Sequence, residues 1–305
     1  MGDSDLKRVV VAGGTGLVGR ALVKALLAQE AQVTVLTRHP GSAVVPAGVR
    51  VRGWIGLAKE LEGVDAVFNL AGEGLADQRW SSRRKALLLS SRVGPTEELV
   101  ESMRACAHRP AVLVNASAIG YYGPGDDTPV SELNPAGEGF LAEICRAWEA
   151  AALPARDLGV RVVLPRLGVV LARDGGALPK MARPVRLFMG SRLGNGQQGL
   201  SWIHLDDLVS LLLEAARNPA WEGPFNATGP EPVSQNTFVR LLAKQLHRPL
   251  LPLPGWLTTA SLRLLLGDMG RELLLEGAYV HPMKAEAQGF PFRFPTPETA
   301  LKDLL

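Results

Sequence analysis

The chain has 305 residues, of which 47% are hydrophobic and 21% are charged, and its formal net charge is +3. This composition is ordinary for a globular protein and excludes a disordered chain. The length allows one large domain or two unequal ones. Basic residues are scattered among 30 acidic residues, so we expect no nucleic-acid partner.

The cysteines and the apolar runs bear on the compartment. Only two cysteines are present, Cys106 and Cys145, which excludes a disulfide framework and favours a reducing environment. We interpret both as inert core or helix residues. No apolar run reaches the roughly 18–20 residues of a membrane span, and the acidic N-terminus is unlike a secretory signal. We therefore expect a cytoplasmic protein without a membrane partner.

The first half of the chain alternates short apolar runs with amphipathic stretches. Strands are predicted at 8–12, 32–36, 65–70, 111–116 and 160–164, and helices at 20–29, 82–102 and 140–153. Continuous β-branched runs are typical of parallel strands that are buried on both faces. The alternation predicts an α/β fold of the Rossmann type, a doubly wound parallel sheet with right-handed crossovers.

The pattern changes at about residue 172. The segment 174–200 is rich in glycine, and prolines repeatedly interrupt the chain after residue 230. A helix is expected at 206–217 and should pack back on the first domain. We predict a nucleotide-binding domain over 1–172 and a smaller, mostly helical substrate domain over 173–305.

A glycine-rich turn lies between the first predicted strand and the first predicted helix. It reads Gly-Gly-Thr-Gly-Leu-Val-Gly over residues 13–19, with the spacing GxxGxxG. Such glycines permit a tight turn, close approach of the backbone to a pyrophosphate, and close helix packing. The flanking strand and helix favour a dinucleotide site over a turn without a ligand. The residues expected to contact the dinucleotide here are Gly13, Thr15, Gly16, Leu17, Val18 and Gly19.

The end of the second predicted strand distinguishes between the two nicotinamide dinucleotides. An acidic residue there would accept hydrogen bonds from the ribose hydroxyls of NAD(H). No Asp or Glu occurs between Ala31 and Lys59, and the strand ends in Thr37 and Arg38. A planar guanidinium suits a phosphate, so the sequence predicts NADP(H) as the cofactor. The alternative is that Arg38 is simply a solvated residue.

Further motifs follow in order along the chain. They are DAVFNLAGE at 65–73, SR at 91–92, SAIGYYG at 117–123, WEAAA at 148–152, RLGVVL at 166–171, GGAL at 175–178, SWIHLDDL at 201–208 and GFPFRFP at 289–295. Together they resemble an extended short-chain dehydrogenase/reductase. The narrower resemblance is to the epimerase-like subfamily with its own C-terminal domain of unknown function, within the NAD-dependent epimerase/dehydratase superfamily.

The resemblance implies further contacts with the cofactor. Leu70, Ala71 and Gly72 would lie along its adenosine side. Arg92 would reach toward the cofactor, and Val170 would lie beside the nicotinamide.

The chain departs from the family in its acid–base residues. Most members place a tyrosine and a lysine four positions apart on one helix face, where the lysine lowers the pKa of the tyrosine. None of the three tyrosines here has a lysine four positions later. Ser117 occupies the position of the family's catalytic serine or threonine, and Tyr121 and Tyr122 follow closely. The alternative for both tyrosines is an aromatic wall or core.

Other side chains are weaker candidates. Glu143 and Arg146 lie on the helix that carries the usual pair, but an exposed ion pair also explains them. His204 could act as a general base, although we favour a packing role for its segment, with Asp206 capping the next helix. Five histidines without an HxxxH or CxxC pattern predict no metal site.

Two functions remain open from the sequence. The first is an NADP(H)-binding, epimerase-like oxidoreductase that acts on an unidentified small carbonyl or hydroxyl substrate, with a homodimer as one arrangement. The second is a catalytically silent nucleotide-binding regulator or scaffold, for example in cell division, which the missing Tyr–Lys pair favours.

Overall fold

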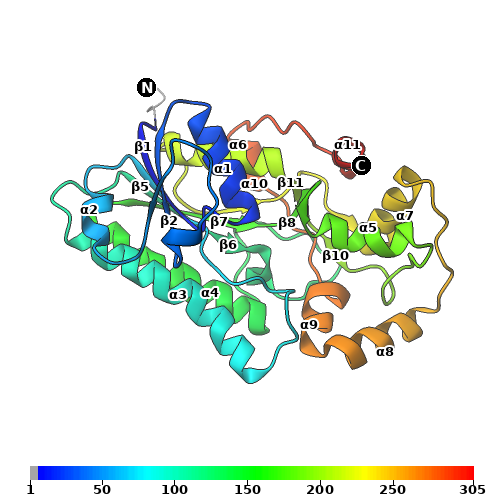
Figure 1. The fold of residues 1–305 in the computed structure, drawn as a ribbon. Helices are drawn as coiled ribbons and strands as arrows, with labels where there is room; N and C mark the ends of the chain where they lie inside the picture. The colour runs from blue at the N-terminus through cyan, green and yellow to red at the C-terminus, as the bar shows by residue number, and fades with distance from the viewer. Residues whose placement is uncertain (1–5) are drawn as a thin grey trace.

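A single parallel sheet forms the centre of the protein, in a computed structural model that describes residues 6–305 (Figure 1). Its strand order is β3-β2-β1-β4-β5-β7-β12, and β6 also pairs with β7. The strands are β1 (Arg8–Ala12), β2 (Gln32–Leu36), β3 (Arg50–Arg52), β4 (Ala66–Asn69), β5 (Val112–Asn115), β6 (Ser117–Ala118), β7 (Arg161–Leu167) and β12 (Gly223–Ala227). The order reverses between β1 and β4, which confirms the predicted doubly wound sheet.

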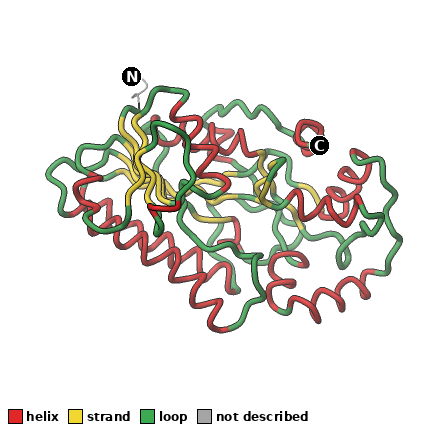
Figure 2. Tube along the Cα trace, viewed as in Figure 1, coloured by secondary structure: helices red, strands yellow, loops and turns green. Residues whose placement is uncertain are grey.

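Helices cover both faces of the sheet (Figure 2). One face packs against α1 (Leu17–Leu27) and α6 (Leu205–Arg217), and the other against α2 (Leu57–Leu61) and α3 (Ser82–Arg104), with α4 (Phe140–Ala152) beside α3. Strand β1 shows why both faces are apolar. Val9 and Val11 belong to the core under α1, and Val10 and Ala12 to the core under α3. Each fully buried valine stabilises the fold by about 1.5–3 kcal/mol.

The remaining elements form a smaller layer beside the sheet. Its strands are β8 (Val169–Ala172), β9 (Gly175–Gly176), β10 (Gly199–Leu200), β11 (Trp202–His204) and β13 (Val233–Ser234). Its helices are α5 (Leu178–Arg186), α7 (Gln235–Gln245), α8 (Gly255–Leu266), α9 (Asp268–Gly270) and α11 (Pro297–Leu304), whereas α10 (Met283–Ala287) packs on β12 of the central sheet. Short 3-10 turns occur at Pro40–Ser42, Ile119–Tyr122 and Leu153–Leu158, and a π turn at Arg271–Leu275. Trp202, Phe238 and Leu301 belong to its shared core.

Helix α6 packs on the central sheet through Leu208, Leu211 and Leu212, as the periodicity predicts. Strand β12 lies beyond residue 172 and adds the last strand to that sheet by pairing with β7. The division of the chain at residue 172 stays a prediction. Among residues 6–305, no helix is long and apolar enough to cross a membrane. The same residues contain no cluster of three His, Cys, Asp or Glu side chains suited to a metal ion.

The N-terminus of α6 corrects one prediction. His204, and not Asp206, caps the helix, because its Nδ1 accepts a hydrogen bond from the Asp206 N–H at 3.0 Å. The imidazole also stacks on Phe294, with ring centroids 3.8 Å apart. Asp207 accepts hydrogen bonds from the N–H groups of Arg293 and Phe294, both at 2.9 Å. The segment therefore holds the C-terminal chain against the sheet.

Candidate functional site

The predicted site residues gather at one edge of the sheet. The glycine turn follows β1, Arg38 follows β2, Leu70 follows β4, and Ser117 follows β5. All these strands are parallel, so their carboxyl ends meet at the same edge. Val170 lies on β8, directly after β7. In sheets of this topology, ligands bind in the crevice where the strand order reverses.

Close packing explains the glycines of the turn. Gly13 has φ +76°, and a Cβ there would lie 2.5 Å from the carbonyl oxygen of Leu70. A Cβ on Gly19 would lie 2.2 Å from the carbonyl oxygen of Gly13. Gly16 begins α1 without any side-chain cap. The first N–H groups of the helix therefore lack helical partners and remain available to an anion, so the turn fits a dinucleotide diphosphate.

A cavity of about 370 Å³ lies beside this turn. Its walls come from the turn, the start of α1 and the segment after β2, and comprise Thr15, Arg20, Thr37, His39, Ser42, Ala43 and Val44. Hydroxyl groups, an imidazole and a guanidinium thus line it without a carboxylate, which suits a phosphate. Arg20, His39 and Ser42 were missed by the sequence analysis, although each lies within a few residues of a predicted contact.

Arg38 forms an ion pair across the mouth of the crevice. Its Nη2 donates to Oε1 of Glu73 at 2.9 Å, and its side chain is 69% exposed. Arg84 approaches the other carboxylate oxygen of Glu73 at 3.5 Å. The hydrogen bond from Arg38, together with the nearby charges, lowers the pKa of Glu73. Glu73 is a further residue that the sequence analysis missed, and it pairs with the guanidinium that is predicted to bind a phosphate.

Arg92 supports the backbone beneath this ion pair. Its Nη2 donates to the carbonyl oxygen of Glu73 at 2.9 Å, and its Nη1 donates to that of Leu88 at 2.9 Å. A Cβ on Gly72 would lie 3.1 Å from Cζ of Arg92. The guanidinium therefore lies directly behind the loop that carries Leu70, Ala71 and Gly72.

A buried polar network surrounds Ser117. Its hydroxyl donates to Oε1 of Glu149 on α4 at 2.7 Å. Arg166 on β7 donates to both oxygens of the same carboxylate, from Nε at 2.8 Å and from Nη2 at 3.0 Å. Burial alone would lower the pKa of Arg166, but the hydrogen bonds to Glu149 outweigh it and raise the pKa. Neither Glu149 nor Arg166 was singled out from the sequence, because residues on a helix and a strand meet only in the fold.

The two neighbouring tyrosines have different surroundings. The hydroxyl of Tyr122 donates to Oδ1 of Asn226 at 2.6 Å and accepts from Nη1 of Arg166 at 3.0 Å. Burial raises the pKa of Tyr122. Tyr121 is half-buried, and its ring centre lies 3.4 Å from Cζ of Arg166. Within residues 6–305, no side chain or backbone group forms a hydrogen bond with the Tyr121 hydroxyl.

Helix α4 contains the two positions at which most family members have the catalytic tyrosine and lysine. Leu141 and Cys145 occupy them, and burial raises the pKa of the Cys145 thiol to about 11. Glu143 and Arg146 are both exposed on the opposite side of the helix. Their side chains therefore point away from the Ser117 network.

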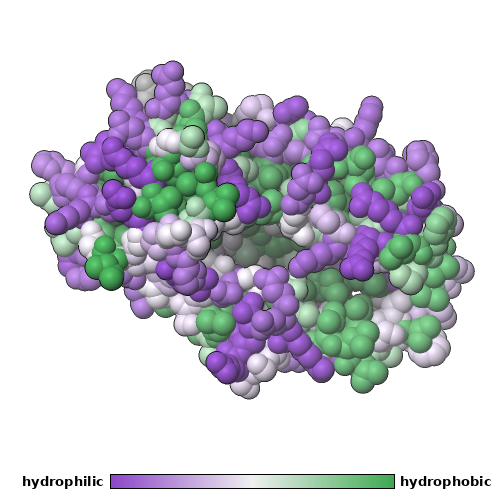
Figure 3. Space-filling view, in the orientation of Figure 1, coloured by the Kyte–Doolittle hydropathy of each residue, from purple (hydrophilic) through white to green (hydrophobic). Residues whose placement is uncertain are grey.

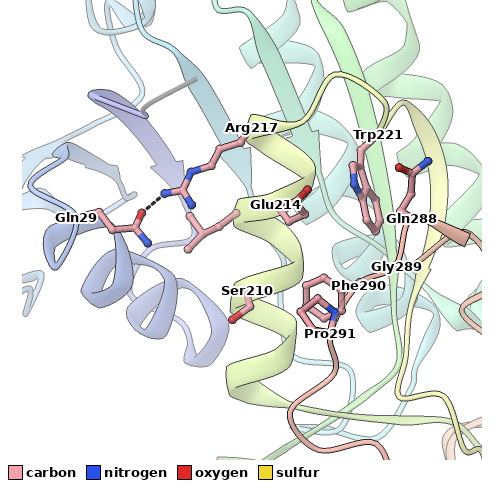
Figure 4. A pocket seen from close by; sticks show the side chains of 10 residues that line it. Gln29, Ser210, Glu214, Arg217, Trp221, Gln288, Gly289, Phe290 and Pro291 are labelled. Atoms are coloured by element: carbon pink, nitrogen blue, oxygen red, sulfur yellow. Dashed lines mark hydrogen bonds between the residues drawn. The ribbon is translucent and has the colours of Figure 1, made fainter. Parts of the chain in front are cut away.

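A second cavity of about 360 Å³ lies at the ends of α1 and α6 (Figure 4). Its lining includes Gln29, Glu214, Trp221 and Phe290. Since both helices run back from the carboxyl edge of the sheet, this cavity lies toward the amino edge. It is separate from the glycine turn.

Comparison with known proteins identifies the family. The model of the NAD dependent epimerase/dehydratase family matches residues 9–228, and that of a domain of unknown function, DUF1731, matches residues 258–304. An epimerase family protein of Staphylococcus epidermidis is 39% identical over 305 residues, which cover 98% of this chain and 99% of the relative. A chloroplastic SDR39U1 homologue of Arabidopsis thaliana is 40% identical over 306 residues, covering 97% and 86%.

Similar solved structures include the human epimerase family protein SDR39U1, crystallised with NADPH. It has a TM-score of 0.87 and 32% identity, over 97% of this chain and 98% of the human one. These matches confirm the resemblance seen in the motifs. The chain belongs to the NAD dependent epimerase/dehydratase family and carries a DUF1731 domain toward its C-terminal end.

Proposed function

We propose that the protein is an NADP(H)-dependent, epimerase-like oxidoreductase that acts on a small carbonyl or hydroxyl substrate. The observation that carries this proposal is the glycine turn together with the carboxylate-free cavity beside it. The human relative crystallised with NADPH supports the choice of cofactor.

Different residues of the crevice would bind different parts of the cofactor. The first turn of α1 would bind the diphosphate through its backbone N–H groups. Arg38 and Thr37 would bind the additional phosphate that distinguishes NADP(H) from NAD(H). Leu70, Ala71 and Gly72 would lie along the adenosine, with Arg92 supporting them from behind. When bound, the nicotinamide supplies or accepts a hydride.

The network around Ser117 suggests which side chains would orient the substrate and transfer a proton to or from it. The Ser117 hydroxyl donates to Glu149, so its lone pairs remain to accept a hydrogen bond from a substrate hydroxyl. Tyr121 has an uncommitted phenol, and its ring packs on the Arg166 guanidinium. This contact holds the Tyr121 ring in place beside the buried ion pair of Arg166 and Glu149. Tyr121 is therefore the proposed acid–base group, with Ser117 orienting the substrate.

Turnover measurements on a matched pair of variants test this proposal. The assay follows NADPH oxidation with a panel of small aldehydes and ketones. We expect Tyr121→Phe to lower kcat by about 10²–10⁴-fold, the usual contribution of a positioned acid–base group. Tyr122→Phe removes a buried hydrogen bond from a hydroxyl that is already committed, so it should mainly lower stability. Equal activity of Tyr121→Phe and the unmodified protein would refute the role of Tyr121.

A second candidate function is a nucleotide-binding regulator without turnover. The observation that favours it is the apolar pair Leu141 and Cys145 at the positions of the usual tyrosine and lysine. It predicts tight NADPH binding, no oxidation of NADPH with any substrate of the panel, and a protein partner whose capture depends on the nucleotide.

A further inference from the structure

Helix α8 exposes several large apolar side chains. Trp256 is 73% exposed, Leu264 is 78% exposed and Leu265 is 67% exposed. At 100° per residue, Trp256 and Leu264 lie on one side of the helix, whereas Thr258 and Leu262 lie on the other. The side that faces the protein thus includes the buried Thr258. Leu265 lies roughly opposite Trp256 on the helix. Leu266 packs against the buried cluster that contains Trp80, so α8 carries apolar side chains on both its inner and its outer side.

Exposed apolar side chains continue from α8 onto the loop after α5. The N–H of Leu251 donates to the carbonyl oxygen of Gly190 at 2.7 Å, and the N–H of Gly194 donates to Oγ1 of Thr258 at 3.0 Å. These contacts join the two segments into one surface, and Figure 3 shows apolar colour over α8 and over the end beyond α5 and α7. We call it the apolar surface; it comprises Leu187, Phe188, Met189, Leu251, Trp256, Leu257, Leu264 and Leu265.

The chain around the apolar surface is basic. No Asp or Glu occurs from residue 178 to residue 204, or from residue 232 to residue 267. The basic residues of these segments are Lys180, Arg183, Arg186, Arg192, Arg240, Lys244, Arg248 and Arg263. Lys180 pairs with Asp77 at 3.6 Å, whereas the others form no ion pair within residues 6–305. The guanidinium of Arg248 lies 4.8 Å from the ring centre of Phe188, so cations and apolar groups share one surface.

We propose that this surface docks the protein peripherally on a lipid bilayer that contains anionic phospholipids. Trp, Phe and Leu side chains enter the interface between headgroups and acyl chains, while Arg and Lys meet the phosphates. The two segments themselves carry no carboxylate, although Asp77 pairs with Lys180 and Asp268 follows α8. Their excess of cations therefore favours contact with anionic headgroups. Two copies meeting through this surface would bring uncompensated cations together, which disfavours a dimer here. The expectation of no membrane partner rested on the absence of a spanning run, and peripheral docking needs none.

Flotation of the whole protein with lipid vesicles tests the proposal. One set of vesicles is phosphatidylcholine alone, and the other contains about one third phosphatidylglycerol. We expect the protein to float with the anionic vesicles, to remain free with phosphatidylcholine alone, and to dissociate at high salt. No recovery with anionic vesicles at low salt would overturn the proposal.

Matched variants test which residues contact the vesicle surface. Trp256→Ser combined with Leu264→Ser should weaken partitioning at least tenfold, whereas Ile55→Ser, which is fully exposed elsewhere, should leave it unchanged. Arg186→Gln should lower partitioning about fivefold, and Lys24→Gln on α1 should not.

Two outcomes of these variants would overturn the proposal. The first is equal partitioning of the Trp256→Ser, Leu264→Ser double variant and the unmodified protein. The second is a dimer in solution that this double variant dissociates, because a second copy would then cover the surface. Unchanged thermal unfolding of each variant establishes that its fold is intact, and none of the substituted residues contacts the nucleotide crevice.

Discussion

Replacing Arg38 with alanine should weaken binding of NADPH much more than binding of NADH. Arg38 is 69% exposed at the end of β2, and its Nη2 lies 2.9 Å from Oε1 of Glu73. On binding NADPH it would exchange this partner for the additional phosphate. NADH lacks that phosphate, so the alanine variant should bind it almost as the unmodified protein does.

The magnitude follows from the exchange of partners. A charge-assisted hydrogen bond to a phosphate contributes about 1.5–3 kcal/mol. The exposed ion pair that Arg38 gives up is worth about 0.2–1 kcal/mol. The net effect is therefore about 0.5–2.8 kcal/mol, which corresponds to about 2- to 100-fold in Kd.

Titration calorimetry with both nucleotides at one ionic strength measures this difference. Lys24→Ala is the matched control, because Lys24 is an exposed cation in the last turn of α1, away from the crevice. It removes the same charge and should leave the ratio of the two affinities unchanged. An equal loss of affinity for NADPH and NADH in Arg38→Ala would show that Arg38 does not bind the additional phosphate.

Three further predictions concern the turn, the buried network and the thiol. Gly19→Ala would place a Cβ 2.2 Å from a main-chain oxygen, so a calorimetric titration should show NADPH affinity at least about tenfold lower. Glu149→Gln removes the charge that pairs with buried Arg166 and should lower the free energy of unfolding by about 3 kcal/mol in urea titrations. The pKa of Cys145 is raised from 9.0 to about 11, so its contribution to stability is complete below pH 9 and is lost as the pH rises to 11. Cys145→Ala should therefore flatten the fall in stability over this range by about 3 kcal/mol.

Each of these predictions has a contrary outcome. Unchanged affinity in Gly19→Ala would mean that the turn has room for a side chain. Unchanged stability in Glu149→Gln would mean that water reaches the pair. An identical pH dependence with and without the thiol would mean that Cys145 is solvated.

Local patterns predicted much of the central sheet. Strands β1 and β2 have the predicted bounds, because a buried parallel strand needs a continuous apolar run. Helix α1 begins at Leu17 rather than at residue 20, since the last residues of the glycine turn are already helical. Strand β12 was missed because it begins with Gly223 and Pro224, which read as a turn. Its pairing with β7 and the burial of Phe225 create the strand.

Contacts between distant residues account for what the sequence could not predict in the site. Glu149 pairs with Arg166, and Glu73 pairs with Arg38, across different elements. No local spacing indicates which arginine is buried and which is solvated. The cap of α6 was assigned to Asp206 because aspartate is a favoured cap, and the structure uses His204 instead.

Both proposed functions depend on a site for NADP(H) at the turn over residues 13–19 and the cavity beside it. Equilibrium dialysis of the nucleotide-free, unmodified protein against NADPH and against NADH tests it most directly. We expect saturable uptake of one NADPH per chain, with NADH bound at least about twofold more weakly. Failure to retain either nucleotide, or equal retention of both, would contradict this expectation.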